Sequence, residues 1–279
     1  MESALHVKPM MMMMFLLIII CSAVLSDHIL SVGNVKAIME SDNYSRGCGS
    51  SLTNDNNVAY QGLNQTLSIR GTVNLSDSTV ILNPSIILPS SILTTRPAYS
   101  HFVVDLLDVK GRVLAHYPVD IIVSTANVEE WKNIAYISEA IPYHPCTTKV
   151  TINKDDKELV SQVVSPNAPE IKSINVSDSN GNPGLIFSRT SNISVEWNAQ
   201  DLDKDDNLTY LLLYSDNGGQ TWPITIADDI KENSLTLNAS SLPGNNATLS
   251  QFRVIATDGV NTDVRDSTPF SIPILDIGH

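Results

Sequence analysis

The chain has 279 residues, with 17 Lys and Arg against 30 Asp and Glu, so its formal net charge is −13. Hydrophobic residues make up 42% of the chain, which is enough for a packed core and too much for a disordered acidic protein. The basic residues are scattered singly, which excludes nucleic acids and anionic membrane surfaces as expected partners, because both require clustered Lys and Arg.

An apolar run at residues 10–25 predicts that the chain is exported. The run reads MMMMMFLLIIICSAVL, follows a basic residue and ends in small residues, which is the order of a secretory signal. Val24 and Ser26 suit a cleavage site before Asp27. We therefore predict a signal peptide over 1–26, an extracellular or cell-surface location and no membrane span after cleavage. An uncleaved anchor is the alternative, although the run is shorter than the about 20 residues of a spanning helix.

Cysteine usage agrees with export. Lipidation of Cys21 is disfavoured, because it requires a small residue where Ile20 stands. Cleavage leaves Cys48 and Cys146, an even pair in an oxidising compartment, and we predict that they form a disulfide. Two unrelated buried thiols are the alternative.

Eight Asn-x-Ser/Thr sequons predict glycosylation, although their number is only modestly above chance. The acceptor residues are Asn43, Asn64, Asn74, Asn175, Asn192, Asn207, Asn238 and Asn246.

The rest of the chain is typical of an all-β protein. Residues 27–65 lack periodicity and predict an irregular arm. Apolar residues then alternate in short runs separated by turn residues, which favours sandwiches of two antiparallel sheets. In the first domain, 66–165, we expect strands within 66–75, 78–88, 101–123, 133–143, 147–155 and 158–164, with a hairpin turn at Lys110-Gly111 and one helical turn at 128–133.

Two prolines in 165–170 mark the boundary to a second domain, 166–279. In this domain we expect strands at 170–178, 184–190, 192–201, 207–216, 222–228, 234–240, 251–259 and 266–274. Ile193, Val195 and Trp197 alternate with polar residues, so one face of their strand should be buried, with Trp197 in the centre of the core. This domain carries 15 acidic and 6 basic residues, a net −9 of the total −13.

Part of that acidity lies in one loop, DLDKDDN at 201–207. Asp201, Asp203 and Asp205 alternate, so several oxygens can point at one hard cation. We consider two interpretations, a Ca²⁺ site and a solvated acidic turn. An EF-hand is excluded, because Asp206 and Leu212 stand where its Gly and Glu are required.

Three segments carry a family resemblance. VEWNAQDLDKDDNLTYLLLYSDNGGQTW and FRVIATDG resemble the Ig-like or fibronectin type III-like modules of secreted archaeal and bacterial surface proteins. The segment RGTVNL…VVDLLDVKGRVLAHYPVD is similar, more weakly, to the β module that precedes them in metallopeptidase-like surface proteins. The resemblance implies two tandem modules without the enzyme. YSDNGGQTW also resembles the Asp-box of sialidase-like propellers, which is a structural turn in that family, and predicts a turn with Trp222 packed over it.

The sequence lacks the motifs of the common hydrolases. Neither His-Glu-x-x-His nor Gly-x-Ser-x-Gly occurs. We therefore expect no enzyme and no cofactor other than Ca²⁺, and a role in adhesion, protein interaction or spacing, with a surface protein or glycan as partner. One alternative is an accessory module that binds carbohydrate or a protease, for which exposed Trp131 and Trp222 would be evidence. The other is a hydrolase with a dispersed site around His101 and His116.

Overall fold

The computed structural model describes residues 65–89, 97, 99–123, 132–203, 207–244 and 248–274. Regular structure in these residues is β, apart from one short 3-10 turn, η3 (Ala239–Ser241), as the sequence predicted. Every strand pair is antiparallel. The predicted signal peptide lies outside the described residues, as does the predicted arm apart from Gln65.

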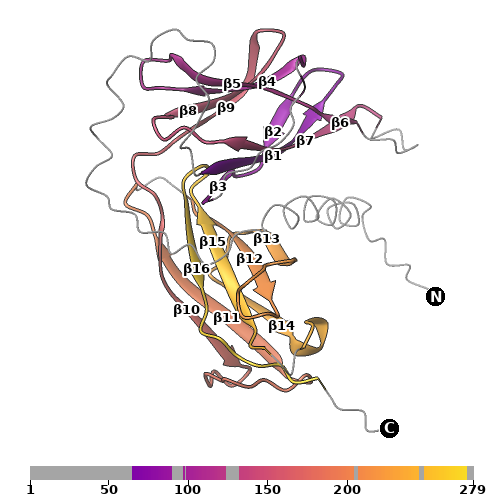
Figure 1. Ribbon diagram of the computed structural model, residues 1–279, viewed down its shortest axis with the longest axis vertical. Helices are drawn as coiled ribbons and strands as arrows, with labels where there is room; N and C mark the ends of the chain where they lie inside the picture. Colours follow the sequence, from indigo (N-terminus) through magenta and orange to yellow (C-terminus); the bar gives the residue numbers. More distant parts are fainter. Residues whose placement is uncertain are drawn as a thin grey trace, which may run out of the picture.

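The first group of strands forms two sheets, in the upper half of Figure 1. The β1 sheet has the order β2-β1-β7-β6, with β3 also paired to β1, and the β4 sheet has the order β5-β4-β8-β9. The strands are β1 (Thr66–Asn74), β2 (Val80–Leu82), β3 (Ile86–Leu88), β4 (Phe102–Leu107), β5 (Val113–Val119), β6 (Ile122–Val123), β7 (Ile134–Pro142), β8 (Lys149–Lys154) and β9 (Lys157–Val163).

The second group of strands also forms two sheets, in the lower half of Figure 1. The β11 sheet has the order β10-β11-β14, and the β12 sheet has the order β13-β12-β15-β16. The strands are β10 (Glu170–Asp178), β11 (Asn192–Gln200), β12 (Thr209–Ser215), β13 (Ile224–Ile230), β14 (Ser234–Asn238), β15 (Gln251–Thr257) and β16 (Thr262–Asp266).

Each group has its own hydrophobic cluster, and both sheets of the group contribute to it. In the first group, Leu67 and Ile69 of β1 belong to the same cluster as Val104 and Leu106 of β4, and all four are 0% exposed. In the second group the members include the whole predicted inner face of β11, with Ile193 and Val195 at 0% and Trp197 at 4%. Period-two alternation therefore identified the buried face of β11 correctly.

Two strands predicted in the second group are wrong. Residues 184–190 and 267–274 form no strand, and a single isolated bridge, Ile186 to Ser271, joins them. Pro269 and Pro273 have no N–H group with which to continue a ladder, and Leu185 and Ile186 are exposed rather than alternating. The apolar content of these segments was mistaken for strand periodicity.

Strand β16 was not predicted as a separate strand. Its sequence TDVRD has one apolar residue, Val264, so no alternation is visible. It forms nevertheless, because a turn at 258–261 returns the chain beside β15, with Val254 opposite Arg265 and Thr257 opposite Thr262.

Candidate functional site

The most elaborate arrangement of side chains lies where the two groups of strands meet. It begins with β12, whose seven residues are all buried. Tyr210 and Leu212 face the cluster of the second group, and Leu211 and Leu213 face the other way. A strand covered on both faces shows a continuous apolar run instead of alternation, as TYLLLYS does.

The first group supplies the cover over the second face of β12. Ile86 and Leu88 of β3 form an apolar cluster with Leu211 and Leu213, together with Trp222 and Ile255. All six residues are at most 7% exposed. We call these six residues the junction cluster, and they bury apolar surface between the two groups.

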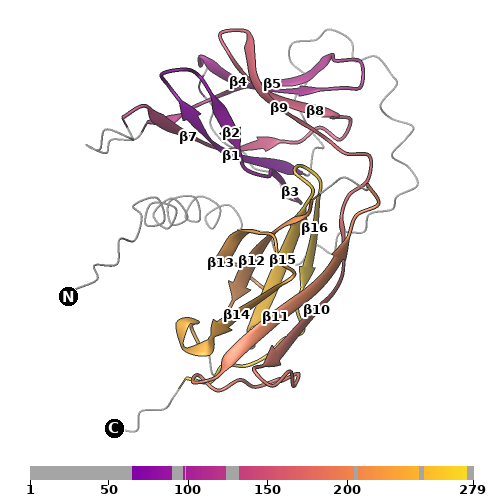
Figure 2. The same ribbon diagram turned by 180° about the vertical axis from the view of Figure 1, so that it is seen from behind.

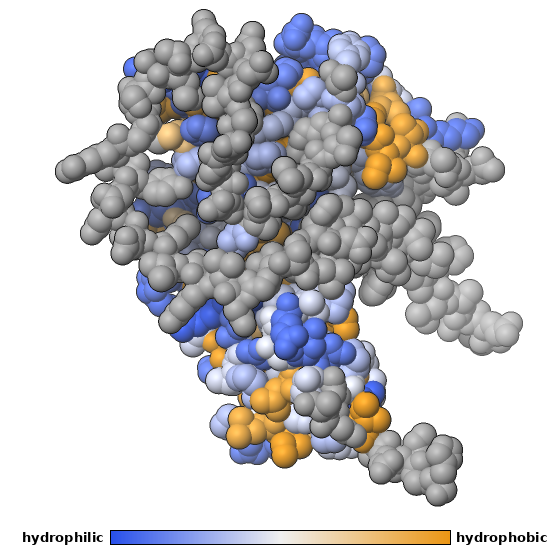
Figure 3. All heavy atoms as spheres, viewed as in Figure 1, coloured by the Kyte–Doolittle hydropathy of each residue, from blue (hydrophilic) through white to orange (hydrophobic). Residues whose placement is uncertain are grey.

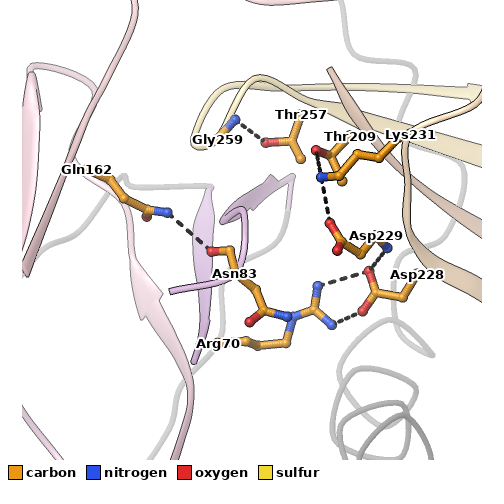
Figure 4. A network of polar contacts seen from close by, with 9 residues as sticks. All are labelled: Arg70, Asn83, Gln162, Thr209, Asp228, Asp229, Lys231, Thr257 and Gly259. Atoms are coloured by element: carbon orange, nitrogen blue, oxygen red, sulfur yellow. Dashed lines mark hydrogen bonds and ion pairs between the residues drawn. The ribbon is translucent and has the colours of Figure 1, made fainter. Parts of the chain in front are cut away.

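A buried ion pair stands beside the junction cluster. The guanidinium of Arg70 on β1 donates to both carboxylate oxygens of Asp228 on β13. The side chains are 7% and 19% exposed. Figure 4 shows Arg70 and Asn83 facing Asp228 and Asp229 across the junction. The backbone N–H of Asp229 also donates to Asp228, at 2.8 Å, so the carboxylate is held from both groups.

Backbone hydrogen bonds of Ser85, which precedes β3, and of Ile87 on β3 add a third kind of contact. The N–H of Ser85 donates to the carbonyl of Gly259 at 2.8 Å, and the hydroxyl of Thr257 donates to the carbonyl of Ser85 at 2.7 Å. The N–H of Ile87 donates to the hydroxyl of Thr262 at 2.9 Å. The β15–β16 turn thus occupies a fixed place against the first group.

Val260, at the tip of that turn, enters the first group. It is 0% exposed and belongs to the hydrophobic cluster of the β1 and β4 sheets. Its neighbour Gly259 has φ +122°, a conformation that favours glycine and lets the turn present Val260. A residue of the second group therefore completes the core of the first.

Side chains of the second group hold the predicted domain boundary through hydrogen bonds. Asp203 accepts hydrogen bonds from the backbone N–H and the side-chain amide of Asn167, at 2.8 and 2.7 Å. Asp258 accepts from the hydroxyl of Ser165 at 2.5 Å, and the amide of Asn261 donates to the carbonyls of Ser165 and Asn167, both at 3.1 Å. The connection between the groups is therefore a clamped segment.

These contacts bear on the predicted Ca²⁺ ligands. Both oxygens of Asp203 already accept hydrogen bonds, and one oxygen of Asp201 accepts the N–H of Asp203 at 2.8 Å. Asp205 lies outside the described residues. The described part of the chain contains no cluster of three or more His, Cys, Asp or Glu placed to hold a metal. The Ca²⁺ site stays a prediction, and Asp203 has a role in the boundary segment that the sequence did not reveal.

The two histidines of the hydrolase alternative contact different carboxylates. Nδ1 of His101 lies 2.6 Å from Asp155, and Nδ1 of His116 lies 2.7 Å from Asp105 across the β4–β5 pair. Both imidazoles are more than half exposed. His116 and Asp105 are opposite each other in the β4–β5 register, and Asp105 also accepts a hydrogen bond from the side-chain amide of Asn153 at 2.7 Å.

The turn around Asn217 is structural, as the Asp-box resemblance implied. The carboxamide oxygen of Asn217 accepts the N–H of Thr221 at 3.0 Å, and the hydroxyl of Ser215 accepts the N–H of Gly219 at 3.0 Å. Trp222 is 0% exposed beside this turn, with the guanidinium of Arg253 4.2 Å from its ring centroid.

Trp131 and Trp222 give no evidence for the exposed aromatic surface that a carbohydrate-binding module would need. Trp222 is buried in the junction cluster, and Trp131 lies outside the described residues. In the described part of the chain, Tyr99 is the one aromatic among the exposed large hydrophobic residues.

Apolar side chains gather at the lower end of the molecule (Figure 3). The exposed large hydrophobic residues of the second group are Leu185, Ile186, Leu202, Leu249 and Ile274.

The remaining predicted sites are only partly described. Cys146 lies in the turn after β7, but Cys48 lies outside the described residues, so the disulfide stays a prediction. The same holds for the sequons at Asn43, Asn64 and Asn246. Asn175, Asn192, Asn207 and Asn238 are exposed, and Asn74 is half-buried.

No protein-family model matches this chain, and no curated protein is similar to it in sequence. No helix within the described residues is long and apolar enough to cross a membrane.

Proposed function

We propose that this chain is a non-catalytic secreted or cell-surface protein that holds two tandem β-sandwiches of Ig-like or fibronectin type III-like type in a fixed relation. It acts in adhesion, in protein interaction or as a spacer. In this proposal the paired sheets around each hydrophobic cluster are the two layers of one sandwich. The proposed partner is a surface protein or a glycan.

The main support for this proposal is the junction between the two groups of strands. A spacer transmits position only if its parts do not rotate against each other, and short polar linkers between domains ordinarily permit such rotation. Here the junction cluster, the Arg70–Asp228 pair and the insertion of Val260 oppose rotation together. The hydrogen bonds from Asp203 and Asp258 hold the boundary segment as well. A rigid frame with loops at its ends suits presentation of a binding surface.

Location and adhesion test the proposal in the protein's own cells. We expect the mature protein to begin at Asp27, to be degraded when intact cells are treated with protease, and to be required for attachment of those cells to surfaces or to each other. An intracellular location would contradict export. Unchanged attachment in cells that lack the chain, together with unchanged assembly of their surface layer, would contradict the adhesion and spacer roles.

The hydrolase alternative is tested with the purified protein. We expect no turnover of peptide, ester or glycoside substrates above that of a heat-denatured sample. Turnover that is lost in both His101→Ala and His116→Ala would overturn the non-catalytic assignment.

The predicted disulfide is tested by mass spectrometry of the secreted, non-reduced protein. We expect a Cys48–Cys146 cross-linked peptide, and two free thiols would exclude that disulfide.

A further inference from the structure

Three sequon asparagines lie on one sheet. Five of the eight sequons have their asparagine in the described part of the chain. Of these, Asn175 is on β10, Asn192 is the first residue of β11 and Asn238 is the last residue of β14. These are the three strands of the β11 sheet, which Figure 2 shows side by side in the lower half of the molecule.

The three asparagines also share one face of that sheet. On β11, the buried residues Ile193 and Val195 alternate with Asn192 and Ser194, so the asparagine points away from the core. Asn238 is directly opposite Asn192 in the register. Asn175 is opposite Glu196, which stands on the same outward face as Asn192.

For Asn175 and Asn192, the strand conformation places the asparagine and the hydroxyl residue of its sequon on the same face. Residues two apart on a strand project to the same side. The hydroxyl residues Ser177 and Ser194 therefore stand beside Asn175 and Asn192, and they are opposite each other across the β10–β11 pair. An exposed carboxamide and its sequon hydroxyl are the two groups that N-glycosylation uses.

The outward face around these residues is polar, and Glu196 is a charged residue on it. Ser194 is opposite Thr236, and Glu196 is opposite Ser234. None of the exposed large hydrophobic residues in the described part of the chain belongs to β10, β11 or β14. Protein interfaces depend on a few buried aromatic or apolar anchors, which this face lacks. A hydrated polysaccharide needs no such anchor.

We propose that the outward face of the β11 sheet carries N-linked glycans, with Asn175, Asn192 and Asn238 as acceptors. Asn192 and Asn238 are alternative acceptors on this face. The carboxamide nitrogen of Asn238 donates to the carboxamide oxygen of Asn192 at 3.2 Å. Opposite residues on paired strands have Cβ atoms about 5 Å apart, so two sugars attached there would compete for one space. This inference rests on the export that is part of the proposed function.

Glycopeptide mapping of the full chain, secreted from a host with N-glycosylation machinery, tests the inference. We expect a glycan at Asn175 and a glycan on either Asn192 or Asn238 in each molecule. In Asn192→Gln the occupancy of Asn238 should rise toward completion, and in Asn238→Gln that of Asn192 should rise. Asn74→Gln is the matched control, because Asn74 lies in the first group, and it should leave both occupancies unchanged.

The failures of the two proposals are distinguishable. Retention of the chain in the cell would contradict the proposed export and the inference that rests on it. Secretion with glycans confined to residues outside the β11 sheet, or with no glycan at all, would overturn the inference and leave export intact. Molecules that carry sugars on both Asn192 and Asn238 would overturn the alternative use of these two acceptors.

Discussion

Arg70 is the charged side chain on which the junction depends most directly. Its side chain is 7% exposed and its carboxylate partner comes from the other group of strands. A buried charge is tolerated only while its partner compensates the lost hydration. Asp228→Ala should therefore destabilise the fold by about 3 kcal/mol, the lower end of the range for breaking buried pairs, since Asp228 keeps some contact with water.

The double variant Arg70→Met/Asp228→Ala should recover part of that loss, because it leaves no orphaned charge. Urea unfolding of both variants measures the difference. Lys149→Met, at the exposed Lys149–Glu158 pair within the β4 sheet, is the control and should cost less than about 1 kcal/mol. A loss as large in the double variant as in Asp228→Ala would show that the ion pair is not what Asp228 contributes.

We expect His144 to make the fold sensitive to mild acid. Burial lowers the pKa of His144 below its ordinary value of 6.5, and its Nδ1 accepts the backbone N–H of Cys146 at 3.2 Å. The unfolded chain then binds a proton more readily than the folded chain, so stability is complete above about pH 6.5 and falls as the pH decreases below it.

We expect the midpoint of thermal unfolding to fall between pH 7.5 and pH 5.5 by more in the natural protein than in His144→Gln, whose side chain does not titrate. Calorimetry at both values measures this. Equal shifts in the natural protein and His144→Gln would remove His144 as the cause.

At the scale of elements, two turns need glycine. Gly111 is required for its backbone conformation alone, and Gly219 is required for its backbone conformation and for space. Gly111 joins β4 to β5 with φ +73°, and a Cβ there would meet nothing within 4 Å. Gly219 has φ +79°, but its Cβ would come within 2.5 Å of the Gln251 side chain and 3.3 Å of Trp222. Gly111→Ala should cost about 1 kcal/mol from backbone strain alone. Gly219→Ala should cost more in urea unfolding, because Gln251 must also move from its hydrogen bond to the carbonyl of Ser267. Equal costs would mean that the space beside Trp222 adapts freely.

Sequence periodicity predicted those elements in which one face is buried. The strand around Val195 alternates, and its buried residues Ile193, Val195 and Trp197 were identified from spacing alone. The hairpin turn at Gly111 was also predicted correctly, because its sequence and its positive φ agree. The strand predicted over 266–274 was wrong. Pro269 and Pro273 interrupt this apolar segment, and a segment without a continuous set of N–H donors does not form a ladder.

The candidate site was much harder to predict than the strands. Arg70 and Asp228 are 158 residues apart, and nothing local in the sequence pairs one basic residue with one of 30 acidic ones. Val260 follows a turn signal and would be assigned to the surface by its position. One signal was available, because the unbroken apolar run of β12 indicates a strand covered on both faces. That signal implies a second layer but does not identify β3 as its source.

At the scale of the whole molecule, each group of strands places residues in a hydrophobic cluster of the other. Val260 of the second group lies in the first cluster, and Ile86 of the first group lies against β12 of the second. We therefore expect the folding of one group to depend on the presence of the other. We also expect a contact that combines shared core residues with a clamped connecting segment to be stiffer than an ordinary, more polar interface between domains.

The cooperativity of unfolding tests this dependence. Ile86→Ala combined with Leu88→Ala removes apolar side chains that are 2% and 7% exposed in the junction cluster, and each substitution should cost about 2–5 kcal/mol. Because this loss falls on the contact between the groups, we expect the single calorimetric transition of the natural protein to separate into two. The radius of gyration from small-angle scattering should increase at temperatures below both transitions. Ile81→Ala is the matched control, since Ile81 stands on the adjacent strand β2 and is 66% exposed. Two transitions in the natural protein, or a separation produced equally by Ile81→Ala, would contradict a rigid junction and with it the spacer role.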